Sequence, residues 1–125
     1  MGQKIVITAG QVKVNAELND SDTAKAIAEK LPIKAKAQRW GEEIYFSIPL
    51  TRGLEEGSRD VVEAGELGYW PSGNAFCIFF GKTPASQGDE IRAASAVNII
   101  GKVEGDLSAL PSVPSGAEVT VEKGA

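Results

Sequence analysis

Carboxylates are the most frequent reactive groups of this chain, and several come as adjacent pairs. Glu42–Glu43, Glu55–Glu56 and Asp89–Glu90 each place two acids side by side, which would suit acid–base chemistry or cation binding if both groups met one substrate. Neighbouring residues of a β-strand point to opposite faces, so such pairs seldom converge. A small-molecule enzyme that uses carboxylates is therefore the last-ranked of our functional hypotheses.

The chain has no histidine and a single cysteine, Cys77. Ser-His-Asp and Cys-His nucleophiles and histidine-bearing zinc sites cannot be built without histidine. A lone cysteine forms neither an internal disulfide nor a thiolate metal cluster, and its apolar neighbours predict a buried thiol of low reactivity. We expect no metal and no cofactor.

Aromatic residues gather in the stretch LGYWPSGNAFCIFFGKTP, from Leu67 to Pro84. Every residue from Ala75 to Phe80 is apolar, which predicts a strand covered on both faces. Trp40, Tyr69 and Trp70 lie next to turns, where amphipathic rings suit a binding surface. We expect Ala75–Phe80 to belong to the core and Tyr69–Asn74 to form a wall of a binding site.

Size and charge restrict the class of protein. The 125 residues fit one domain, residues 1–125, with 42% hydrophobic and 24% charged residues, enough to fold without metals or disulfides. A net charge of −4 with scattered lysines and arginines forms no basic stripe, which argues against nucleic acid and anionic membranes. No apolar run approaches the roughly 18 residues of a membrane helix, and no secretory signal is evident. We expect a cytoplasmic protein with neither nucleic acid nor membrane as a partner.

Short alternating segments predict an antiparallel sheet. KIVIT and VKVNAEL predict a hairpin over Lys4–Leu18, and IKAKAQRW and EIYFSIPL predict a second one. A helix is expected between them, capped by Asp20 or Ser21 and ended by Pro32. AFCIFF, VNIIGKV and AEVTV predict later strands, after a long connection with a helical turn near Glu90–Ala93. About eight short strands with one or two short helices favour a mainly β fold, and a closed eight-stranded barrel leaves no exposed edge.

Several segments resemble the cyclophilin family. VKVNAELNDSDTAKAIAEKL is similar to that family's strand, turn and first helix. GNAFCIFFGKT resembles its Asn-Gly-Ser-Gln-Phe-Phe strand and the loop after it, and VNIIGKVEGDLSAL resembles its late Val-Phe-Gly-Lys-Val strand. WGEEIYFSIP, GYWPSGNAFCIFFGKTP and SAVNIIGKVEG look more closely like the small bacterial and archaeal cyclophilin-like proteins of uncharacterised function. The resemblance covers nearly the whole chain and implies an eight-stranded cyclophilin-like barrel.

The activity that this resemblance implies is peptidyl-prolyl cis-trans isomerisation. Rotation about an X-Pro bond crosses a barrier of about 18–20 kcal/mol, and a catalyst needs an apolar pocket for the proline ring and a donor to the imide nitrogen. Arg39 falls where the family's His-Arg-Ile places its catalytic arginine, and a guanidinium stays charged at any working pH. The family's pocket glutamine and phenylalanine match Ala75 and Cys77 here.

The first hypothesis is accordingly a barrel that binds a proline-containing or short extended peptide, or another small ligand, with isomerase activity carried by Arg39. Its ligand-binding residues are expected to be Trp40, Phe46, Tyr69, Trp70, Asn74 and Phe76. The alternative is a non-catalytic binding or self-assembly module, such as a homodimer joined through its aromatic rim.

Overall fold

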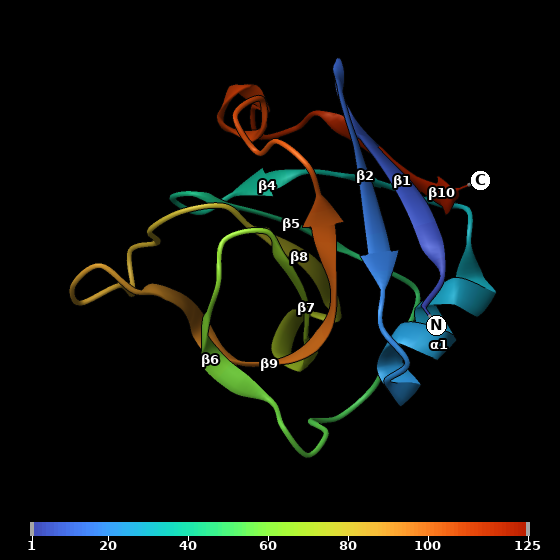
Figure 1. Ribbon diagram of the computed structural model, residues 1–125, viewed down its shortest axis with the longest axis horizontal. Helices are drawn as coiled ribbons and strands as arrows, with labels where there is room; N and C mark the ends of the chain where they lie inside the picture. The colour runs from blue at the N-terminus through green and yellow to red at the C-terminus, as the bar shows by residue number, and fades with distance from the viewer. Residues whose placement is uncertain (1, 125) are drawn as a thin grey trace.

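The structure, a computed structural model, describes residues 2–124, which form ten β-strands, one α-helix and two short 3-10 helices (Figure 1). The predicted mainly β fold is confirmed. In chain order the elements are β1 (Lys4–Ala9), β2 (Val12–Leu18), α1 (Asp22–Lys30), β3 (Ile33–Lys36), β4 (Gln38–Arg39), β5 (Glu43–Ser47), β6 (Arg59–Val62), β7 (Glu66–Trp70), η1 (Pro71–Gly73), β8 (Ala75–Phe79), β9 (Ile91–Glu104), η2 (Leu110–Ser112) and β10 (Glu118–Lys123).

The strands form one antiparallel sheet in the order β3-β10-β1-β2-β9-β7-β8-β5-β4, and β6 pairs with the start of β9. This hydrogen-bonded path does not close on itself, so the closed eight-stranded barrel is not confirmed. Its two ends, β3 and β4, are separated only by Ala37, whose backbone bonds to Gly116 and Ala117. The chain thus passes from pairing with β10 to pairing with β5 within a few residues.

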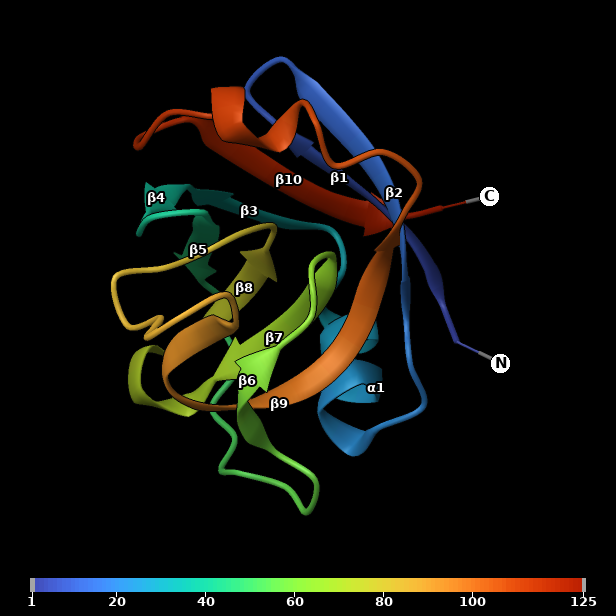
Figure 2. The same cartoon turned by 60° about the vertical axis from the view of Figure 1, so that its left-hand side comes forward.

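The helix α1 packs against β2 and β9, as Figure 2 also shows. Its cap is Ser21, one of the two predicted residues, whose hydroxyl accepts the backbone N–H of Ala24 at 3.2 Å. Asp22 in the first turn and Lys30 in the last complement the helix dipole. Pro32, just beyond the end, cannot continue the helix.

Two hydrophobic cores lie on opposite faces of the sheet. The strand β8 is buried on both faces, as its uninterrupted apolar sequence predicted: alternate residues point into each core. The larger core includes Ile5, Ile7, Leu18, Ile27, Ile44, Phe46, Leu67, Tyr69, Phe76, Ile78 and Ile100. The smaller one consists of Val62, Ala75, Cys77, Phe79, Ala93 and Val97.

The long strand β9 connects the two cores because its partners change along its length. Its first residues pair with β6, its middle with β7 and its end with β2. The register shifts between Leu67 and Gly68, where β9 is paired with β7, and such an irregularity bends a strand. Figure 2 shows the resulting curve, which carries the first half of β9 over the smaller core.

Candidate functional site

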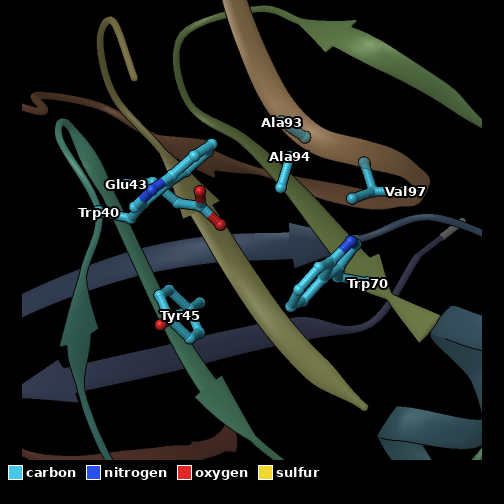
Figure 3. A pocket seen from close by; sticks show the side chains of 7 residues that line it. All are labelled: Trp40, Glu43, Tyr45, Trp70, Ala93, Ala94 and Val97. Atoms are coloured by element: carbon cyan, nitrogen blue, oxygen red, sulfur yellow. The ribbon is translucent and has the colours of Figure 1, made fainter. Parts of the chain in front are cut away.

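A cavity of about 170 Å³ opens beside the smaller core, between the β4–β5 turn, β5, β7 and β9. Aromatic and small apolar side chains form most of its wall, and Figure 3 shows the carboxyl of one acid pointing toward the space between two tryptophan rings. The lining residues are Trp40, Glu43, Tyr45, Trp70, Ala93, Ala94 and Val97. We call this cavity the tryptophan pocket.

The alternation of side chains along β5 decides which of its residues line the tryptophan pocket. Ile44 and Phe46 point into the larger core, so Glu43 and Tyr45 lie on the opposite face. Glu43 is only 5% exposed because the rings of the pocket and the first half of β9 surround it. An acid is thus buried in an apolar setting.

Burial decides the protonation of Glu43. Loss of hydration raises the pKa of this carboxyl to about 7, and the neighbouring thiol of Cys77 opposes the rise as a hydrogen-bond partner. The same thiol also donates to the carbonyl of Ala75, with 3.9 Å between sulfur and oxygen. Burial, with the carboxyl of Glu43 as a further cause, raises the pKa of Cys77 well above its ordinary value, so the thiol stays protonated.

Trp70 is held in place from two sides. Its indole Nε1 donates to the hydroxyl of Ser95 on β9 at 2.6 Å. Gly73 in η1 lies against its ring: a Cβ added there would come within 2.9 Å of the ring's Cζ3. The close approach therefore requires glycine.

Trp40 is positioned by a tight turn between β4 and β5. Its backbone N–H donates to the carbonyl of Glu43 at 3.0 Å, and Gly41 has a φ of +61°, a conformation that glycine adopts without strain. The guanidinium of Arg39 donates to the carbonyl of Gly41 from Nε at 3.2 Å and from Nη2 at 2.9 Å. Arg39 thus braces the turn that presents Trp40.

The remaining contacts of Arg39 lead away from the tryptophan pocket. Its Nη1 donates to the carbonyls of Pro111 at 2.9 Å and Val113 at 2.8 Å, near η2. The guanidinium also lies over the ring of Phe80, 5.2 Å from the ring centre, with Glu42 at 4.0 Å. Arg39 does not line the pocket, and its catalytic role stays a prediction.

The structure brings two of the predicted ligand-binding residues, Trp40 and Trp70, together in the pocket. Phe46 and Phe76 stack in the larger core, 5.1 Å between ring centres. Tyr69 is fully buried in that core, and its hydroxyl donates to the carbonyl of Leu50 at 2.7 Å.

Asn74 was expected in the wall of a binding site but lies in a turn outside the tryptophan pocket. It adopts the left-handed conformation, with φ +48°, and closes the turn after η1. Its amide oxygen lies 3.2 Å from the hydroxyl of Tyr69. It ties the turn to the larger core and is absent from the lining of the tryptophan pocket.

The paired acids do not converge on one site, but strand geometry is not the reason, because Glu43 is the only one of the six that lies in a strand. Glu42 is half-exposed and Asp89 fully exposed. The carboxylate of Glu90 accepts the backbone N–H groups of Gln87 and Gly88, and these bonds, with Arg92, lower its pKa to about 2. Only Glu43 enters the tryptophan pocket.

Within residues 2–124 no three acids or thiols lie close enough together to hold a metal ion. No helix in that part of the chain has both the length and the apolar character needed to cross a bilayer.

Solved structures of other proteins share this architecture. The solution structure of the hypothetical protein AF2241 from Archaeoglobus fulgidus is 42% identical in sequence, covers 98% of this chain and 95% of its own, and superposes with a TM-score of 0.84. The structure of McbB in complex with tryptophan has a TM-score of 0.62 at 14% identity, covering 94% of this chain but only 44% of McbB, and so shares the fold alone. No curated protein matches the chain. The description of the cyclophilin-like family fits residues 3–122, and the chain belongs to that family.

Proposed function

We propose that the protein binds a ligand that inserts one apolar group the size of a single ring into the tryptophan pocket. The observation that carries this proposal is a cavity of about 170 Å³ walled by Trp40, Tyr45 and Trp70. A dry cavity of about 150 Å³ accommodates one benzene ring. The pocket therefore has room for one ring and not for a second.

The walls of the pocket suit such a group because they are rigid before it arrives. The braced turn holds the backbone of Trp40, and the bond to Ser95 holds the side chain of Trp70. Binding then costs little side-chain entropy, and rigid rings offer a large contact area. Ligand pockets are characteristically apolar with few polar groups, and here the polar group is the carboxyl of Glu43.

The ring can belong to a proline residue of a peptide or to a free small molecule, and the family supports the former. Isomerisation of a proline peptide is the finer form of the proposal and needs a free donor beside the imide nitrogen. The donor implied by the family is Arg39, whose N–H groups would first have to leave the carbonyls of Gly41, Pro111 and Val113. The proposed function is therefore ligand binding, which does not require isomerase activity.

The test is calorimetric titration with N-acetyl-proline methylamide, cyclohexanol and, as a ringless control, N-acetyl-glycine methylamide. A variant that fills the pocket, Ala94→Phe, leaves the core intact because Ala94 is exposed on the pocket rim. Ala64→Phe, on an exposed turn away from the pocket, is its matched control.

The wild type and Ala64→Phe should bind at least one ring compound more tightly than the glycine compound, and Ala94→Phe should lose that binding at least tenfold. Binding of proline but not of cyclohexanol would assign the pocket to peptides. No preference for rings, or equal binding by Ala94→Phe, would overturn the proposal.

A further inference from the structure

The carboxyl of Glu43 is the feature of the tryptophan pocket that ring binding leaves unexplained. A buried acid costs stability unless it is paired, and most buried polar groups have at least one hydrogen-bond partner. Glu43 is 5% exposed and has the Cys77 thiol beside it, yet Figure 3 shows its oxygens directed toward the open space between the two indoles. The geometry leaves room for a donor or a cation from a ligand.

We infer that the group bound by this pocket is an organic ammonium, methylated or cyclic, held among Trp40, Tyr45 and Trp70 with its charge facing Glu43. The inference rests on the proposed function and names its ligand class. Aromatic walls attract cations through the negative faces of their rings, and indole is the strongest of the side-chain rings in this respect. A methylated or cyclic ammonium also offers the apolar surface and the ring-like size that the pocket requires.

The protein's own cations do not occupy this position. Arg39 lies over Phe80, outside the pocket. On the β6–β9 side, Arg92 pairs with Asp60 at 2.8 Å and with Glu90 at 3.1 Å. Within the described chain no lysine or arginine lines the pocket, so the pocket itself offers no cation to Glu43 when it ionises, and a ligand cation would supply the counter-charge.

Few ionisable groups face Glu43, so few neighbours affect its titration. The strand β8 supplies Cys77, whose pKa burial raises, and β5 supplies Tyr45. Trp40, Trp70 and the stretch of β9 over the pocket contribute no ionisable side chain among the described lining residues. Since burial raises the pKa of Glu43 to about 7, the acid ionises near neutral pH, and an ammonium would bind with release of its proton.

The probes for this inference are choline and its uncharged isostere 3,3-dimethylbutan-1-ol, which share size and shape. At pH 8 the wild type should bind choline at least tenfold more tightly than the alcohol. From pH 6 to pH 8 the affinity for choline should rise about tenfold as Glu43 ionises, with no such rise for the alcohol.

Glu43→Gln should remove both the preference for choline over the alcohol and the pH dependence of choline binding. Equal binding of the two probes by the wild type, unchanged in Glu43→Gln, would overturn the ammonium inference and leave ring binding intact. Failure of both probes to bind a folded wild type that does bind cyclohexanol would overturn the ammonium inference alone, whereas failure of cyclohexanol as well would remove the proposed function. The pH series uses the wild type alone, so it decides the matter even if the variant folds poorly.

Discussion

The indole N–H of Trp70 donates to the hydroxyl of Ser95 at 2.6 Å and so fastens one wall of the tryptophan pocket to β9. Trp70 ends β7, and Ser95 lies in the part of β9 that curves over the smaller core. One hydrogen bond therefore connects a wall of the tryptophan pocket to the strand that covers it.

Ser95→Ala should loosen this wall. Because Ser95 is exposed, we expect a loss of no more than about 1 kcal/mol in unfolding free energy, together with a several-fold loss of affinity for ring compounds. Urea denaturation and calorimetric titration measure the two effects. The control is Ser72→Ala on the exposed turn of η1, and equal affinity in both variants would show that the hydrogen bond has no role in binding.

Gly73→Ala should displace the ring of Trp70 from its present position. The added methyl would lie 2.9 Å from the ring, whereas Gly53→Ala, the control, meets no atom within 4 Å. We expect a shifted indole N–H signal in the NMR spectrum and weaker ring binding for Gly73→Ala alone. An unchanged Trp70 signal would mean that the contact is looser than the structure indicates.

Arg39→Lys should destabilise the fold, since an ammonium cannot reproduce the fork that bonds to the carbonyls of Gly41, Pro111 and Val113. We expect a loss on the order of 2 kcal/mol in urea denaturation and, through the turn that carries Trp40, weaker ring binding. Arg52→Lys, whose side chain makes none of these bonds, is the control.

The same variant decides the catalytic prediction for Arg39. A proline-peptide isomerisation assay in which the wild type accelerates the reaction, while Arg39→Lys is inactive yet as stable as the wild type, would support catalysis by Arg39. A loss of stability with no isomerase activity in the wild type would assign the residue to bracing the turn.

Glu43→Gln should become progressively more stabilising as the pH rises. A carboxyl whose pKa is raised from 4.5 to about 7 on folding favours the folded state while it is protonated, and this advantage is lost between those pH values. The difference in unfolding free energy between Glu43→Gln and the wild type should therefore grow by about 3 kcal/mol from pH 4.5 to above pH 7. Glu56→Gln, exposed and outside the pocket, should show no such trend; a flat difference for Glu43→Gln would mean that the carboxyl is hydrated.

Local pattern was enough to predict much of the fold. The cap at Ser21, the stop at Pro32 and the doubly buried strand, predicted over Ala75–Phe80 and found over Ala75–Phe79, follow from side chains next to one another in the chain. The helical turn expected near Glu90–Ala93 was wrong, because β9 begins at Ile91. Its alanine-rich sequence extends only because β6, some 30 residues earlier, pairs with it.

The site was less predictable for the same reason. Turn-flanking tryptophans indicated Trp40 and Trp70, and both line the pocket. Alternation in EIYFS could have placed Glu43 beside Tyr45, but its burial depends on Ala93 and Val97, which the curve of β9 brings over it. No local signal reports contacts of that sequence separation.

Ring binding at the tryptophan pocket can be tested most directly by following the two indole N–H signals by NMR during titration with a ring compound. The chain has only two tryptophans, so Trp40→Phe and Trp70→Phe assign both signals without ambiguity. We predict that both signals shift together and saturate at one equivalent of bound ligand. Signals that stay in place while resonances elsewhere in the folded protein shift would contradict the account.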